Sequence, residues 1–232
     1  TYSAAPHFKL SDNAAIYARI AKGYRPGGPN VLPLRTPAGT PRTYASDSLI
    51  SYETGFKADL AGRTFSIDVS AFYLKWKDIQ LFTTINDTGV NANGKTAVSK
   101  GFEFSTILRP ARQLTVSING AYTDARLTAD TPTDIGGRDG DALPYTPKWS
   151  TTVSVDYEKE ISEAATAYIG STLRFVGEQP AEFDAAHREL YGRRRILPSY
   201  EVIDLNLGVR FKHWSIEAYV NNLNNSVGKT AV

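Results

Sequence analysis

Residues that could perform catalysis or hold a metal are sparse in this sequence. The chain has only three histidines, His7, His187 and His213, and none stands at a metal-site spacing from another. His187 lies near Asp184 and Glu189, but a short charged stretch of this kind more often exposes one face to water. A hydrolase needs a placed histidine with a serine or an aspartate, and we identify no such set. The sequence therefore predicts no catalytic residue, no metal site and no cofactor.

Composition narrows the class of protein further. There is no cysteine, so the chain has no disulfide framework and no thiol metal site. The net charge is +2 with acids and bases interspersed, which gives no broad nucleic-acid-binding surface. No stretch approaches the roughly 20 apolar residues of a membrane-spanning helix. The mean hydropathy of -0.31 is nevertheless compatible with a membrane barrel, because its strands alternate lipid-facing and lumen-facing side chains.

The dominant pattern in the sequence is the alternation of apolar and polar residues with a period of two. In residues 50–60, the side chains of one face are Ile50, Tyr52, Thr54, Phe56, Ala58 and Leu60. The other face carries Ser51, Glu53, Gly55, Lys57 and Asp59. The same separation recurs in residues 65–73, 114–123, 203–211 and 214–221. A helix would mix the two sets, whereas a strand separates them, so the sequence predicts an all-β protein.

The connections between the predicted strands alternate in length. Short turns are expected at Ser11–Asn13, Ala61–Arg63, Pro110–Gln113, Glu158–Ala164 and Lys212–His213. Long segments rich in Gly, Pro, Asn and Arg lie at Arg25–Asp47, Phe82–Val98, Thr128–Pro144 and Gly177–Pro198. We count about ten strands, several of about 11 to 13 residues, where a tilted transmembrane strand needs about 9 to 11. Short turns on one side and long loops on the other are typical of antiparallel up-and-down outer-membrane barrels.

Aromatic residues cluster towards the expected strand ends, where two interfacial girdles would form. They are Tyr17, Tyr24, Tyr52, Tyr73, Trp76, Phe82, Tyr122, Tyr145, Trp149, Tyr157, Tyr200 and Trp214. A soluble β-sandwich is the alternative, although its strands are usually shorter, about five or six residues. The two folds differ in where they put Ile50, Phe56, Val69 and Ile118. A barrel turns these residues outward to lipid, and a sandwich buries them against a second sheet.

Several local patterns resemble the C-terminal barrel half of TonB-dependent outer-membrane receptors. In chain order they are Ile16-Tyr17-Ala18-Arg19 with Lys22–Asn30, Ser51-Tyr52-Glu53-Thr54-Gly55-Phe56-Lys57, Ala71-Phe72-Tyr73 with Asp78-Ile79-Gln80, Gly101-Phe102-Glu103-Phe104, Leu143-Pro144-Tyr145-Thr146-Pro147, and Val220–Asn225. Each pattern is weak alone, but they follow the family's order and span nearly the whole chain.

The resemblance implies a transmembrane β-barrel in the bacterial outer membrane. Family barrels have 22 strands, so residues 1–232 would be a partial C-terminal barrel domain. The plug domain and the TonB-contacting segment are not in the sequence, and it ends at Lys229–Val232 without the family's final strand and terminal aromatic residue. The implied function is TonB-dependent active uptake of a scarce ligand, with a ferric siderophore as the commonest class. The implied partners are membrane lipid, lipopolysaccharide, the protein's own plug, and the TonB complex.

The resemblance implies roles for two groups of residues. The expected plug-facing lumen wall is formed by Glu53, Lys57, Glu103, Arg174, Arg210 and Glu217. Ligand contact is expected from the long extracellular loops, because arginine binds oxygen anions through paired donors and aromatic rings offer flat contact. The candidates are Arg25, Arg42, Tyr44, Phe82, Tyr145, Phe183, Tyr191, Arg193, Arg194 and Arg195. For the run Arg193–Arg195, the alternatives are a solvated loop or contact with lipopolysaccharide phosphates.

Two other functions are compatible with the pattern of strands. A small passive pore would require about ten strands to close into a barrel by themselves. An outer-membrane barrel hydrolase would require His187 to meet a nucleophile at the rim.

Overall fold

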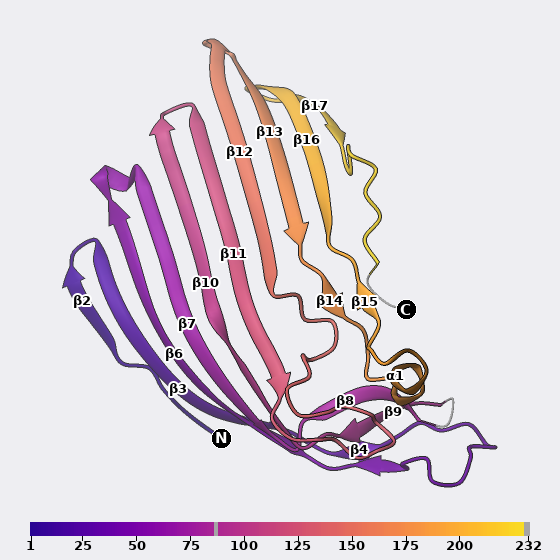
Figure 1. Ribbon diagram of the computed structural model, residues 1–232. Coiled ribbons are helices and arrows are strands. Elements are labelled where there is room, and N and C mark those ends of the chain that lie inside the picture. Colours follow the sequence, from indigo (N-terminus) through magenta and orange to yellow (C-terminus); the bar gives the residue numbers. More distant parts are fainter. Residues whose placement is uncertain (86–87, 230–232) are drawn as a thin grey trace.

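A single long antiparallel sheet dominates the computed structural model, which describes residues 1–85 and 88–229 (Figure 1). At one edge, β1 (Tyr2–Ala4) and β2 (His7–Ser11) both pair with β3 (Ala14–Arg25). The order then continues through β6 (Asp47–Leu60), β7 (Phe65–Lys77), β10 (Thr96–Ala111), β11 (Leu114–Leu127), β12 (Trp149–Ser162), β13 (Ala165–Val176), β16 (Tyr200–Phe211) and β17 (Ser215–Val220). Since β1 and β2 share one position, the described sheet has ten positions, as the sequence predicts.

Connections of two kinds lie at opposite ends of the sheet (Figure 1). The 3-10 turn η1 (Ala61–Arg63) and the other short turns close one end. At the other end lie β4 (Gly28–Pro29), β5 (Thr43–Tyr44), β8 (Gln80–Ile85), β9 (Thr88–Asn93), β14 (Gln179–Pro180), α1 (Ala185–Tyr191) and β15 (Ile196–Leu197). None of the helices in the described ranges is long and apolar enough to cross a membrane. The predicted alternation of loop length is confirmed.

Three predicted connections differ in extent from the structure. The turn expected at Glu158–Ala164 is shorter, because β12 continues to Ser162. Pro110 falls inside β10 rather than in a turn. The loop expected at Phe82–Val98 consists largely of the β8–β9 hairpin and the start of β10, and its residues 86–87 lie outside the described part. Residues 230–232, part of the expected chain end, also lie outside it.

The register places polar and apolar side chains on separate faces. Residues directly opposite in an antiparallel pair point to the same side. On one side Phe56 pairs with Val69, which pairs with Phe104. On the other, Lys57 pairs with Asp68 in the same way. We call these the apolar face and the polar face.

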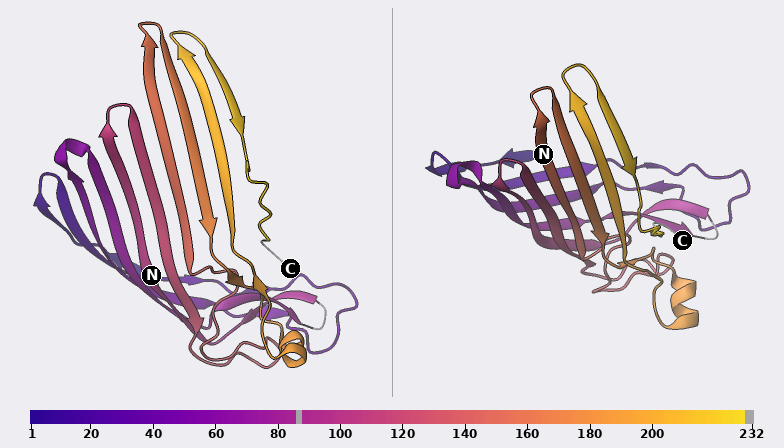
Figure 2. Two further views of the ribbon diagram at one scale, coloured as in Figure 1. Left: turned by 45° about the horizontal axis from the view of Figure 1, so that its top comes forward. Right: turned by 90° about the horizontal axis from the view of Figure 1, so that it is seen from above.

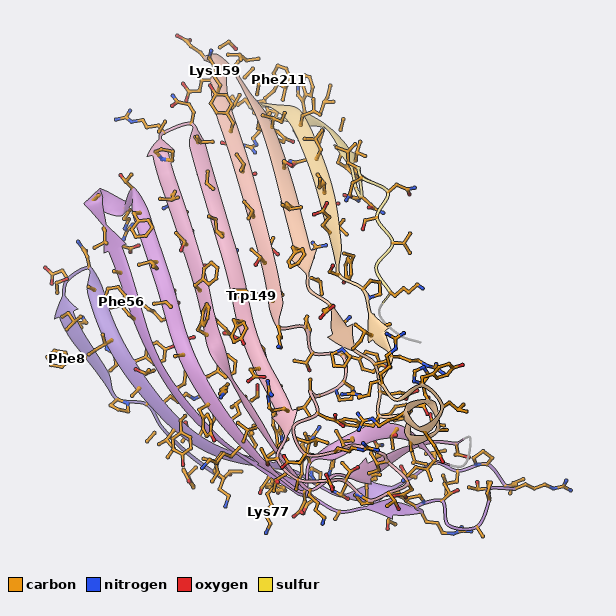
Figure 3. The ribbon with its side chains drawn as sticks, in the orientation of Figure 1. Phe8, Phe56, Lys77, Trp149, Lys159 and Phe211 are labelled. Carbon is orange, nitrogen blue, oxygen red and sulfur yellow. The ribbon has the colours of Figure 1, made fainter. Side chains whose placement is uncertain are left out.

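The apolar face has no second sheet packed against it in the described residues, so the β-sandwich alternative is wrong (Figures 1 and 2). Ile50, Phe56, Val69 and Ile118 are only half-buried, and large apolar side chains such as Ile169 and Leu207 are exposed. Figure 3 shows side chains standing on the open sheet and crowding only at its long-loop end. The buried core of the molecule lies there rather than under the sheet.

Aromatic side chains form a row on the apolar face near the long-loop end. Phe102, Tyr122 and Trp149 are in mutual contact, with ring centroids 5.0 to 5.7 Å apart. At the short-turn end, Phe211 stacks on Trp214 at 4.0 Å, and Tyr157 lies eight positions along β12 from Trp149. Eight residues of strand span about 26 Å along the strand, which at a tilt of about 40° is about 20 Å of height, most of the roughly 25 Å of an outer-membrane apolar band.

Five of the expected girdle residues lie elsewhere. Tyr200 stands on the polar face, and Phe82 and Tyr145 belong to the long connections. Tyr17 is on the polar face, where its hydroxyl donates to Glu53 Oε1 at 2.6 Å. Trp76 pairs with Ala97 on the polar face and packs against the core at the long-loop end. Their positions in the chain suggested an interface, but the alternation of side chains turns them inward.

We expect Ile118→Arg to destabilise the protein in lipid, because Ile118 lies midway between the two aromatic rows on the apolar face. A charged side chain at the membrane midplane costs about 2–4 kcal/mol in barrels. Unfolding of the full-length protein by guanidinium chloride in phospholipid vesicles measures this change. The control is Ser117→Arg on the polar face, for which we expect a much smaller effect. Equal losses for both variants would contradict the assignment of the faces.

Candidate functional site

The polar face forms a hollow that crosses seven strands. Its volume is about 520 Å³, and its lining comes from β3, β6, β7, β10, β11, β12 and β13. Glu53, Glu103 and Arg174, three of the predicted wall residues, line it. The remaining three, Lys57, Arg210 and Glu217, stand on the same face by register. All six thus share one surface, and their contact with a plug stays a prediction.

Short-range bonds hold the side chains of this wall in place. Lys57 Nζ lies 2.7 Å from Asp68 Oδ2. The Tyr17 ring lies across β6 at Gly55, where an added Cβ would be 2.3 Å from the ring. Gly55 therefore leaves the room that lets Tyr17 lie flat and reach Glu53, an arrangement known to stabilise glycine in sheets.

A similar arrangement occurs on the polar face near the opposite edge of the sheet. The Tyr168 ring lies over Gly208, where an added Cβ would be 2.6 Å from the ring carbon that bears the hydroxyl. Arg210 lies 5.2 Å from the centre of the same ring and 3.6 Å from Glu158. The wall is therefore polar but ordered, with aromatic rings bridging neighbouring strands.

The four long connections fold together over the polar face at the long-loop end of the sheet. We call residues 26–46, 78–85, 88–95, 128–148 and 177–199 the loop cap. Its buried core joins all but the first of these segments to the ends of β10 and β11. The members are Ile79, Leu81, Ile85, Val90, Ala92, Ala97, Ala125, Leu127, Ile135, Leu143 and Phe183. Because Ala97 and Leu127 belong to the polar face, the cap lies inward over that face rather than outward.

Arg25 joins the base of the cap, and its contact with a ligand stays a prediction. Its guanidinium binds the buried carboxylate of Asp47, with Nε 3.0 Å from Oδ2. Asp47 also accepts the backbone N–H of Gln80 at 3.2 Å, and Gln80 Nε2 donates to the carbonyls of Pro26 and Ala45 at 2.9 Å. This network ties the ends of β3 and β6 to β8.

Asparagine side chains tie the first connection to the β8–β9 hairpin. Asn30 Nδ2 donates to the Asn91 carbonyl at 2.9 Å, and Asn30 Oδ1 accepts the Asn91 N–H at the same distance. The side chain thus replaces a strand partner for Asn91. Asn93 binds both the N–H and the carbonyl of Ala45, at 2.7 and 3.0 Å. The first connection is therefore held by polar bonds, although it contributes little to the core.

The run Arg193–Arg195 divides into three different environments, so it is not simply a solvated run. Arg194 turns into the cap, donates to the carbonyls of Ala142 and Ala181, and lies 4.3 Å from the centre of the Phe183 ring. Burial lowers the pKa of Arg194 to about 10, so the side chain is still charged at neutral pH. Its Nε is buried without a partner in the described residues.

Its two neighbours remain nearer the surface. Arg193 is exposed, and its carbonyl lies 3.0 Å from His187 Nδ1. Arg195 lies 3.7 Å from Asp184, which also caps α1 by accepting the N–H of His187. These contacts stabilise the segment around α1.

The sequence analysis did not identify one mostly buried ion pair of the cap. Arg188 Nη2 lies 2.8 Å from Asp141 Oδ2, and both side chains are less than one-fifth exposed. The pair joins α1 to the β11–β12 connection, 47 residues away in the chain. Phe183, expected at the surface as a ligand contact, is 3% exposed and belongs to the core of the cap, so that expectation is wrong for its side chain.

The other candidate ligand contacts are more open. Phe82 is 68% exposed and Tyr191 is 67% exposed. Tyr191 packs on the His187 ring at 4.6 Å, and with Arg193 it forms an open group at the end of α1. Arg42, Tyr44 and Tyr145 have no side-chain bond to this group in the described residues. The structure thus leaves these candidates in more than one patch of the cap.

His187 is placed as a structural residue. Its ring contacts Tyr191 and the Arg193 carbonyl, and no serine hydroxyl is among its partners in the described part of the chain. This arrangement offers no support for a hydrolase.

Comparison with known proteins gives a consistent result. The family model described as TonB dependent receptor-like, beta-barrel matches residues 1–223. The pesticin receptor of Yersinia pestis is 26% identical over 223 residues, covering 93% of this chain and 30% of the relative. The metal-pseudopaline receptor CntO of Pseudomonas aeruginosa is 25% identical over 198 residues, covering 85% of this chain and 25% of the relative.

Solved structures share the fold. The ferric yersiniabactin uptake receptor FyuA of Yersinia pestis has a TM-score of 0.77 at 23% identity, covering 99% of this chain and 33% of that one. The ferric preacinetobactin receptor BauA of Acinetobacter baumannii has a TM-score of 0.70 at 19% identity, covering 96% and 32%. The chain therefore spans about a third of the length of the proteins that it matches.

We expect Arg194→Ala to loosen the loop cap, because two part-buried carbonyls lose a charged donor, each such bond being worth about 1.5–3 kcal/mol. Hydrogen exchange should accelerate by at least about tenfold for the Tyr145 amide, which bonds across the two connections to Pro180, and for the Ala181 amide, which bonds to Arg195 within residues 177–199. Arg193→Ala is the matched control, since that side chain is exposed, and it should leave both rates unchanged. Unaltered exchange in Arg194→Ala would show that Arg194 does not hold the cap together.

Proposed function

The chain belongs to the TonB-dependent receptor β-barrel family of the bacterial outer membrane, and from this premise we propose that it serves TonB-dependent active uptake of a ferric siderophore. In this proposal the chain is the C-terminal part of a 22-stranded barrel, and it supplies barrel wall and extracellular loops. The energy for transport comes through TonB and a plug domain carried by other parts of the receptor. These residues perform no catalysis.

The observation that carries the proposal is the inward-folded loop cap. Long connections that pack together over the lumen obstruct the free passage of small solutes that a passive pore provides. An uptake receptor, in contrast, must hold a scarce ligand at the mouth before it moves inward. The core of the cap, the Arg25–Asp47 pair and the Arg188–Asp141 pair hold the connections in a defined arrangement, which reduces the entropy lost on binding.

Exposed side chains on this ordered cap supply the proposed ligand contacts. Phe82 and Tyr191 offer apolar rings, and Arg42 and Arg193 offer donors for the oxygen anions of a siderophore. The related receptors are named for pesticin, metal-pseudopaline, ferric yersiniabactin and ferric preacinetobactin. The last three names support a metal-chelate ligand as a class and leave its identity open.

The polar wall completes the proposed route. Glu53, Glu103 and Arg174 would face the plug and exchange bonds with it or with water as it rearranges. Polar side chains suit this role because their partners can be replaced by water at small cost.

We expect cells that carry the full-length receptor to accumulate radiolabelled iron from a ferric siderophore under iron limitation, and to lose this uptake when tonB is deleted. A panel of hydroxamate, catecholate and mixed-ligand chelates identifies the ligand. Uptake that persists without TonB, together with passive entry of small solutes, would favour a pore instead.

A second set of variants tests the cap. We expect Phe82→Ala, Tyr191→Ala and Arg193→Ala together to weaken ligand binding by about tenfold or more, since aromatic and arginine contacts carry much of the energy at interfaces. Equilibrium binding to the purified full-length receptor measures the loss. Tyr24→Ala, an exposed tyrosine on the apolar face, is the control and should bind normally. If the triple variant also bound normally, the ligand would have to sit elsewhere.

A further inference from the structure

The β8–β9 hairpin of the loop cap has main-chain groups along both of its outer edges (Figure 1). In an antiparallel pair, residues that bond to the partner strand alternate with residues whose N–H and C=O point away from it. Asn91 points away from β8, because its N–H and C=O both bond to the side chain of Asn30, at 2.9 Å each. Phe82 stands opposite Asn91, so its own N–H and C=O point away from β9.

The same direction holds at every second residue of β8. Gln80 comes two residues before Phe82, and its main-chain groups also bond outward. Its N–H donates to Asp47 Oδ2 at 3.2 Å, and its C=O accepts from Arg25 Nη2 at 3.3 Å. Thr84 comes two residues after Phe82, so its N–H and C=O point away from β9 as well.

Phe82 and Thr84 form an open strand edge, which we call the β8 edge. Their outward N–H and C=O groups have no partner in the part of the chain that the structure describes. Both residues are exposed. The Phe82 ring leaves the edge clear, because it leans the other way, over Gly89 of β9, where an added Cβ would be 2.9 Å from the ring.

The β8 edge is held in position by the core of the cap. Thr83, between its two residues, is 1% exposed, and its hydroxyl donates to the Phe183 carbonyl at 3.4 Å. The open stretch is short, since Arg25 and Asp47 occupy the main-chain groups of the preceding outward residue. A partner therefore meets a fixed edge two outward residues long, which suits a short segment better than a long strand of another protein.

The order of donors and acceptors on the β8 edge matches an extended peptide. The outward groups of Phe82 and Thr84 repeat after about 7 Å, which is also the repeat of outward groups along any strand. A peptide of about three residues can therefore form up to four bonds with the edge, as in β-strand addition. A carboxylate or phosphate group has acceptors only, so it would leave both C=O groups unpaired.

We infer that the β8 edge binds the main chain of the imported ligand, and that this ligand is a metal chelate built on a short peptide. The inference rests on the proposed uptake function and adds the chemical class of its ligand. The amides of the peptide pair with Phe82 and Thr84, and the exposed Phe82 ring supplies apolar contact beside them. Because the edge uses main-chain atoms, it recognises the repeat of a peptide rather than particular side chains.

The test compares the binding of two synthetic ferric chelates to the purified full-length receptor. One is a linear tripeptide with a hydroxamate on each side chain. The other is the same tripeptide with methylated main-chain nitrogens, which can no longer donate to the C=O groups of the β8 edge. We expect the parent receptor to bind the first chelate at least about fivefold more tightly, since the loss of one main-chain hydrogen bond has about that effect. Equal binding of the two chelates, or binding of neither, would overturn the inference.

A variant of the receptor tests the same bonds from the other side. Thr84→Pro removes one donor at an outward position, where an edge strand tolerates proline, and should weaken binding of the unmethylated chelate about fivefold. Thr84→Ala keeps the N–H and should retain binding within about twofold. Hydrogen exchange of the Thr83 and Val90 amides, which pair within the hairpin, shows whether the hairpin stays folded.

Two further results separate this inference from the proposed function. TonB-dependent import of a ferric chelate without amides, with binding that Thr84→Pro does not alter, would leave the proposed function standing and show that the peptide class is wrong. Absence of TonB-dependent uptake for every chelate would contradict the proposed function, and the inference with it.

Discussion

The backbone of a chain in lipid must satisfy its own hydrogen bonds, and the rest of this structure depends on that constraint. Long antiparallel strands meet it by pairing each main-chain group with a neighbour, and their period of two then separates the side chains into two faces. The lipid-facing side can be apolar and the lumen side polar without any buried core between two layers. This is why the molecule has an extended sheet and a small core confined to one end.

At the long-loop end, the polar face is covered by the loop cap instead of facing the lumen. Ala97, Ala125 and Leu127 occupy polar-face positions but are buried, because the loop cap packs on them. The cap must satisfy its own main chain without the regularity of a sheet. It does so with side chains: Asn30 pairs with Asn91 as a strand would, and Arg194 donates to two carbonyls. Irregular segments thereby obtain defined positions over the lumen.

The sheet could be predicted from the sequence because the features that determine its strands are local in the chain. The alternation around Ile50 and Phe56, and the contrast between short turns and Gly/Pro-rich segments, define strands, faces and their order without knowledge of distant contacts. The alternation also grouped the wall residues from Glu53 to Glu217 on one face.

The cap was harder to predict because its contacts join distant segments. Nothing near Arg188 in the chain identifies Asp141 as its partner, and a run of three arginines gives no sign that the middle one turns inward. Phe183 looks like any exposed loop aromatic until the β8–β9 hairpin is placed over it. Tyr17 and Trp76 lie near strand ends, but the parity of their positions directs them to the lumen side. Parity could have identified both in the sequence, whereas the partner of Arg194 could not have been found there.

The way in which Arg194 holds the cap has a consequence for how such a surface can evolve. Its acceptors are main-chain oxygens at positions 142 and 181, and every amino acid supplies one. Substitutions at those positions leave the acceptors unchanged. These two bonds therefore require an arginine at position 194 but no particular amino acid at positions 142 and 181. A receptor built in this way can diversify the outward side chains of its loops while retaining their arrangement.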